Sequence, residues 1–327
     1  MPSVPWLSIF LDGDGQYEKD HFKELLVVSH LARPVRYSRP MHPLSLDSEL
    51  PLTCTRSGSC CHGHRIAVTA WEIAMLARDM GMSPAECRNR YTEDGATRLR
   101  FNGLSDHVGR SACTFYSSES GCTVHQSRPL ACRVYPLARR RDKEQSTFTF
   151  AGGVNPCLTR CPDVEQLPTQ RLGDWLASQT LAPGLAAHDA YGDLVWGLLV
   201  TAAAIAASGD LAIGAVVSEA ERRILLSGDE RIPFLPPPWF DLLTVPELPV
   251  DPSDPVAFVG AHGRRLQQAI ANDFALPPTL EEITLLILTM AIHLSPMVGI
   301  NERTVISEFI NQVAVGQASS RSLVKST

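Results

Sequence analysis

The stretch "CTRSGSCCHGH", which begins at Cys54, concentrates soft metal ligands within a few residues. It contains the adjacent pair Cys60 and Cys61, followed by His62 and His64. Thiolates and imidazoles are zinc ligands, and thiolates also hold iron–sulfur clusters. Such a segment is either cross-linked by disulfides or built around metal.

Three further segments carry cysteines: "CTFYSSESGC", "CTVHQSRPLACRVYP" and the closely spaced C-x3-C pair "CLTRCP". Spacings of two to four residues are typical of metal-binding loops. The candidate metal ligands are Cys54, Cys60, Cys61, Cys113, Cys122, Cys132, Cys157 and Cys161. This number exceeds the four thiolates of one zinc ion or one 4Fe-4S cluster. Two metal sites, or one cluster with additional thiols, are both compatible with the sequence.

The N-terminal residues favour metal over disulfides. They have no basic region, and their short apolar stretch contains Pro5, which is unlike a secretory signal. The longest apolar stretch, residues 195–207, is shorter than a bilayer-spanning helix. We therefore expect a cytoplasmic protein without a membrane partner, whose nine cysteines are reduced.

Several side chains near the cysteines could support a metal centre. Arg128 and Arg133 could offset thiolate charge or donate to sulfur, and Tyr135 lies in the same motif. Their alternative roles are surface ion pairs and packing. His62 and His64 either complete a Cys/His site or are exposed loop residues.

Composition limits the function classes. The chain has 327 residues, 44% of them hydrophobic, and a formal net charge of −6. This balance indicates a globular protein and argues against a nucleic-acid partner. The partner we expect is a protein or peptide whose identity the sequence does not reveal. No Walker loop, G-x-S-x-G elbow or G-x-G-x-x-G helix entry is present.

All cysteines fall between residues 54 and 161, which divides the chain into three segments. We predict an N-terminal arm (1–50), a cysteine-cluster metal-binding domain (51–165) and a helical domain (166–327). The predicted fold class is mainly α with a small β element, a cysteine-rich module being followed by an irregular helical domain.

Local signals place the elements. Thr69 with Glu72 and Thr279 with Glu282 are capping boxes that begin helices, and Ser83 with Glu86 is a third. The third helix start places Cys87 on a helix, as a buried structural cysteine. The alternating segment 146–153 predicts a strand, with the charged residues 139–145 as the preceding turn. The proline-rich residues 233–255 predict a connection without regular structure, and residues 316–327 a frayed tail.

The motifs "CTRSGSCC", "RPLACRVYP" and the late "CP" resemble the YkgJ-type cysteine-cluster family, a zinc- or iron-chelating domain with a CxxxCC-like core. The resemblance covers roughly residues 51–165. It implies that the metal ligands include Cys54, Cys60, Cys61, Cys113, Cys122, Cys132 and Cys161.

Three functions remain open at this point. The first is an iron–sulfur protein with a redox or modifying activity. The second is a structural zinc protein that acts by binding a partner. The third is an S-adenosylmethionine-dependent protein lysine methyltransferase, because bacterial flagellin lysine methylases resemble this family through their own cysteine cluster.

Overall fold

The computed structural model describes residues 43–54, 57–142, 145–150, 155–161, 164–209, 211, 213–235, 239–245, 248–273 and 279–325. The chain forms two compact units. Unit 1 contains the described residues within 1–62, 117–121 and 130–181, and unit 2 those within 63–116, 122–129 and 182–327. Most of the predicted N-terminal arm lies outside the described residues. The predicted boundaries at residues 50 and 165 stay a prediction, since the chain passes between the units several times inside the predicted cysteine domain.

Unit 1 consists of short elements. A two-residue strand pairing, β1 with β10, and a longer hairpin, β8 with β9, are both antiparallel. The elements are β1 (Glu49–Leu50), α4 (Leu130–Val134), β8 (Leu137–Asp142), β9 (Gln145–Phe150), α5 (Cys157–Arg160), β10 (Gln170–Arg171) and α6 (Leu172–Ser178).

The arginine run lies in a strand, which corrects the prediction that residues 139–145 form a turn. Arg139, Arg140 and Arg141 belong to β8, and Arg139 lies opposite Phe148 in β9. A hairpin of two strands leaves long charged side chains in contact with solvent, so the charges do not oppose strand formation. The predicted strand from Ser146 is confirmed up to Phe150.

In unit 2, two helices follow the first cysteine loop as predicted. In α2 (Ala70–Met80), Thr69 and Glu72 form the complete capping box, and Gly81 ends the helix at φ +68°. In α3 (Pro84–Tyr91), Ser83 accepts a hydrogen bond from the Glu86 backbone, so the cap is present without the return bond of a full box. Short antiparallel pairings follow, β2 (Thr92–Glu93) with β3 (Arg98–Leu99) and β4 (Phe101–Ser105) with β5 (Ser111–Cys113).

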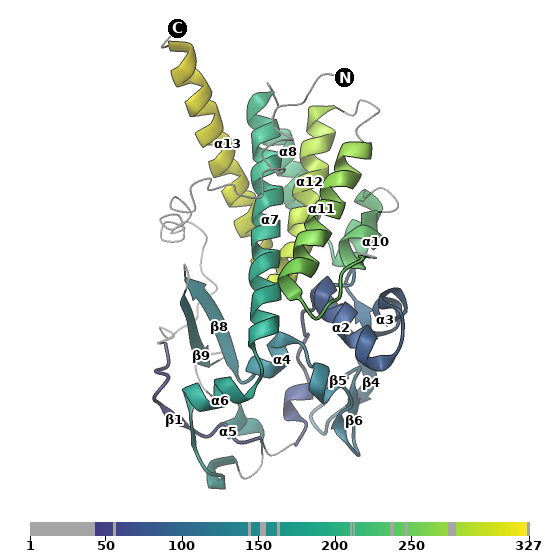
Figure 1. Ribbon diagram of the computed structural model, residues 1–327, viewed down its shortest axis with the longest axis vertical. Coiled ribbons are helices and arrows are strands. Elements are labelled where there is room, and N and C mark those ends of the chain that lie inside the picture. Colours follow the sequence, from purple (N-terminus) through teal and green to yellow (C-terminus); the bar gives the residue numbers. More distant parts are fainter. Residues whose placement is uncertain are drawn as a thin grey trace. The chain divides into compact units, whose positions relative to one another are not determined.

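The remainder of unit 2 is a helical bundle. The long helix α7 (Ala182–Ser208) packs against α11 (Pro255–Asp273), α12 (Leu280–Leu294) and α13 (Glu302–Lys325), and α8 (Ile213–Ile224) packs against α12 and α13 (Figure 1). Its core contains the fully buried side chains of Ile205, Ile287, Leu288 and Phe309. The mainly helical fold with small antiparallel strand pairs is therefore confirmed.

Two predictions about this region are wrong. The proline-rich segment contains helix α10 (Trp239–Thr244), because Trp239 and Leu243 are completely buried and hold it in place. The predicted frayed tail is helical as far as Lys325, where α13 ends. Local composition misses α10, since burial overrides a weak local preference.

Two helical segments, residues 182–208 and 280–298, are long and apolar enough to cross a membrane on length and composition alone. The first segment is helix α7, which is longer than the apolar stretch 195–207 because it begins earlier, at Ala182. Of their most apolar windows, 44% and 67% respectively are buried within the protein. The cytoplasmic location stays a prediction.

Candidate metal centre

The first cysteine segment is a tight loop in unit 1. Gly58 has a left-handed conformation (φ +74°) and precedes the 3-10 turn η2 (Ser59–Cys61). The backbone N–H of Cys61 donates to the Gly58 carbonyl over 2.8 Å. This turn places the sulfur atoms of Cys60 and Cys61 4.0 Å apart. Neighbouring sulfurs around a tetrahedral zinc with Zn–S bonds of about 2.3 Å lie about 3.8 Å apart, so this spacing is compatible with shared metal ligation.

The last cysteine segment forms a single helical turn. The Cys161 N–H donates to the Cys157 carbonyl over 3.0 Å, which closes α5. The side-chain oxygen of the buried Asn155 accepts from the Cys157 N–H over 3.0 Å at the start of the turn. Residues four apart on a helix share a face, so the turn brings the two thiols to one side.

Hydrogen bonds hold these two segments together although about a hundred residues separate them. The Ser59 hydroxyl donates to the Arg160 carbonyl over 2.7 Å, and the Ser57 hydroxyl donates to the Cys161 sulfur over 3.5 Å. The loop and the turn therefore form one structure. The contacts come from the serines that lie between the cysteines of the first segment. A prediction based on cysteine spacing alone does not consider these serines.

The thiols in this structure influence one another electrostatically. Burial and then the neighbouring thiols of Cys161, Cys60 and Cys54 together raise the pKa of Cys157 to about 12. The pKa of Tyr135 is also raised to about 12, first by burial and then by the charge of Cys157. Without a compensating cation, ionising these thiols together is costly. A bound metal ion supplies that compensation.

The donor set fits a thiolate-bound metal. Cys54, Cys60, Cys157 and Cys161 provide four sulfurs, which is the number taken by tetrahedral zinc or by one 4Fe-4S cluster. Within the described ranges, no three His, Cys, Asp or Glu side chains already converge as a metal ion requires. Metal binding would therefore include a local closure of the thiols, in line with the coupling of binding and folding.

The remaining predicted ligands have different surroundings. Cys61 adjoins Cys60 in the loop, and Cys132 lies on α4 of the same unit. Cys113 and Cys122 belong to unit 2, where both pack against an apolar cluster that includes Ile73, Leu76 and Phe115. All nine cysteines are present as thiols.

Cys87 is 1% exposed in that apolar cluster of unit 2, which confirms its predicted burial on a helix. Burial, and to a smaller extent the charge of Glu86, raises the pKa of its thiol to about 11. Cys87 is therefore a protonated core residue at neutral pH.

The predicted supporting residues are dispersed. Tyr135 lies close enough to Cys157 for the charge of that thiolate to raise the pKa of the tyrosine hydroxyl. The Arg133 guanidinium donates to the Gln179 carbonyl over 3.2 Å, and Arg128 donates to the His125 carbonyl over 3.0 Å. The arginine whose charge acts on Tyr135 is Arg160, which sequence reasoning missed although it directly precedes Cys161.

Of the two loop histidines, His62 is buried, contrary to the exposed-residue alternative. Its Nδ1 lies 2.9 Å from the Gly58 carbonyl, so Nδ1 carries the proton in that hydrogen bond. The Nε2 atom is then the one with a lone pair. His64 is partly buried.

Comparison with known proteins supports metal chelation. Residues 53–151 match the family model CxxCxxCC, described as a "Putative zinc- or iron-chelating domain". This match confirms the resemblance to a cysteine-cluster family, and the matched segment contains Cys54, Cys60, Cys61, Cys113, Cys122 and Cys132. No curated protein and no solved structure shows significant similarity to the chain.

Proposed function

We propose that the protein is an iron–sulfur protein whose centre lies in unit 1 and is held by Cys54, Cys60, Cys157 and Cys161. The observation that carries this proposal is the hydrogen-bonded junction between Ser57–Ser59 and Arg160–Cys161, which joins the two cysteine segments. A cluster held there would supply electron transfer or Lewis acidity. The chain's own contribution is to hold the thiols and to place Tyr135 and Arg160 beside them.

Exposure of the thiols favours a reactive centre over a closed structural one. Cys54 and Cys60 are exposed, whereas Cys157 and Cys161 are partly buried. Structural zinc sites are usually closed and fully coordinated. An accessible thiolate centre is better suited to exchanging electrons or metal with a protein or peptide partner.

Structural zinc is the second candidate, and the Cys60–Cys61 sulfur separation of 4.0 Å favours it. In that case the metal stabilises unit 1 and the protein acts through partner binding. The lysine methyltransferase hypothesis stays a prediction.

The test is to purify the full chain without oxygen and to measure iron, zinc and acid-labile sulfide per chain, together with the visible spectrum. We expect iron and sulfide in similar amounts and an absorption band that bleaches on reduction. Cys157→Ser should remove most of the metal, while Cys87→Ser should retain it because Cys87 belongs to the core of unit 2. Stoichiometric zinc without sulfide would establish the second candidate.

A protein without bound metal, or equal metal loss in both variants, would refute the proposed centre. The variants Cys113→Ser and Cys122→Ser test whether the metal ligands also include these two cysteines of unit 2. Full metal retention in both would restrict the ligands to unit 1.

A further inference from the structure

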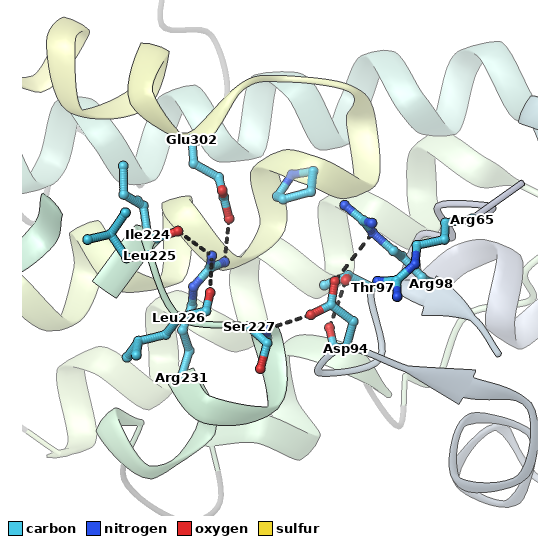
Figure 2. Close-up of a pocket in the computed structure, with 12 residues that line it drawn as sticks. Arg65, Asp94, Thr97, Arg98, Ile224, Leu225, Leu226, Ser227, Arg231 and Glu302 are labelled. Atoms are coloured by element: carbon cyan, nitrogen blue, oxygen red, sulfur yellow. Dashed lines mark hydrogen bonds and ion pairs between the residues drawn. The ribbon is translucent and has the colours of Figure 1, made fainter. Parts of the chain in front are cut away.

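A cavity of about 310 Å³ lies within unit 2, separate from the thiol centre. Its volume is at the lower end of the range for small-molecule sites. Figure 2 shows that its walls come from Arg65, from the turn 94–98, from residues 224–231 and from the start of α13 at Glu302. The lining is predominantly polar, which suits a charged ligand better than an apolar one.

Reciprocal hydrogen bonds join two turns that form the walls of the cavity. The Asp94 carboxylate accepts a hydrogen bond from the Gly228 N–H over 2.6 Å, and the Asp229 carboxylate accepts from the Gly95 N–H over 2.9 Å. A Cβ atom at residue 228 would lie 2.1 Å from the Asp94 carbonyl oxygen, so only glycine fits. The cavity is therefore preformed, which reduces the entropic cost of binding.

Most charges in the walls already have partners. Arg231 is 5% exposed, donates to the carbonyls of Arg223 and Leu226, and forms an ion pair with Glu302. The other carboxylate, Asp94, forms an ion pair with Arg98 over 3.3 Å. Each carboxylate is thus matched by one guanidinium.

Arg65 is the surplus cation, and backbone pairing places it beside Arg98. Ala67 forms an antiparallel bridge with Arg98, supported by hydrogen bonds from Val68 N–H to Thr97 and from Leu99 N–H to Ile66. Arg65 lies two residues before Ala67, and its side chain lines the same cavity as that of Arg98. Across the described ranges, Arg65 has no carboxylate within ion-pair distance. Two adjacent guanidiniums repel each other unless an anion lies between them.

We propose that this cavity binds the phosphate group of a small metabolite, with Arg65 and Arg98 as its main ligands. A guanidinium presents a planar pair of donors that matches two phosphate oxygens. Thr97 and Ser227 also line the cavity, but the Thr97 hydroxyl donates to the Asp94 carbonyl and the Ser227 hydroxyl accepts from the Glu230 N–H, so the two arginines are the groups left for the anion. This inference is independent of the proposed metal function.

The test is a calorimetric titration of the full-length protein, as purified, with inorganic phosphate in chloride buffer at constant ionic strength. We expect saturable binding of one phosphate per chain. Arg65→Gln should weaken binding about tenfold, as expected for loss of a charge-assisted contact. The matched control is Arg303→Gln, since Arg303 is exposed on α13 next to Glu302 but does not line the cavity. The control should change affinity by less than about twofold, because an exposed charge outside the cavity is screened by solvent and salt.

Absence of saturable binding, or equal weakening by both variants, would overturn the proposal. Acetate should bind more weakly than phosphate at the same ionic strength. Equal affinity for acetate would overturn the assignment to a phosphate group. Arg65 is exposed, and the melting temperature of Arg65→Gln should match that of the wild type, which makes a loss of affinity attributable to the site.

Discussion

Unit 2 should lose stability between pH 7.5 and pH 5 because two of its histidines are buried in neutral form. His262 and His293 are completely buried, and burial lowers the pKa of each to about 4. The Nε2 atom of His293 lies 2.9 Å from the Gly95 carbonyl, whereas its buried Nδ1 has no hydrogen-bond partner among the described residues. Protonating that nitrogen would bury a charge without a direct partner, beside the cation of Arg231.

The magnitude follows from proton linkage. In the unfolded chain a histidine has a pKa of about 6.5, so below that pH the unfolded state binds more protons than the folded state. The stabilising contribution is therefore present above pH 6.5 and is lost as the pH falls toward 4. For a folded pKa of about 4, the loss between pH 7.5 and pH 5 is about 2 kcal/mol per histidine and about 4 kcal/mol for both.

Urea unfolding at a series of pH values, followed by helical circular dichroism, measures this loss. His293→Gln and His262→Gln should each reduce it by about 2 kcal/mol, because neither glutamine titrates. Each variant will also be less stable at pH 7.5 through altered packing, so the quantity to compare is the pH-dependent part. His107→Gln is the control, since His107 is exposed. A wild-type loss below about 1 kcal/mol, or an unchanged loss in both buried variants, would refute the reasoning.

Two further predictions concern the turns and the metal. Gly228→Ala should destabilise unit 2 by about 2–3 kcal/mol in urea unfolding, because its Cβ would lie 2.1 Å from the Asp94 carbonyl oxygen. Gly192→Ala on α7, where a Cβ meets nothing within 4 Å, should be neutral or slightly stabilising, and equal costs would contradict the steric argument. Removing the metal should increase hydrogen exchange in residues 57–61 and 155–161. Exchange in α12 should stay unchanged, and uniform deprotection of both units would contradict a centre confined to unit 1.

Local sequence signals predicted the helix starts well. Thr69 with Glu72 and Thr279 with Glu282 each form the full capping box that the T-x-x-E spacing indicates. These signals work because donor and acceptor lie within four residues of each other. Helix α10 was missed for the opposite reason. Its stability depends on complete burial of Trp239, which is determined by distant parts of the chain.

The sequence predicts which side chains could bind metal, but it does not predict which of them lie together in the fold. Cysteine spacing identified the thiols, and the family match supports chelation by this segment. Spacing does not show that Cys113 and Cys122 pack against the apolar cluster of unit 2 while Cys157 and Cys161 adjoin the first loop. That division depends on contacts between residues about a hundred positions apart.

The net charge of the whole chain does not predict the charge of an individual site. A formal charge of −6 argues against anionic partners for the chain as a whole. At the cavity of unit 2, however, Glu302 is paired with Arg231, and Asp94 is shared between Gly228 and Arg98. Neither carboxylate neutralises Arg65. An acidic protein can therefore present a positive site, because recognition depends on the charges that remain uncompensated within a few ångströms of the ligand.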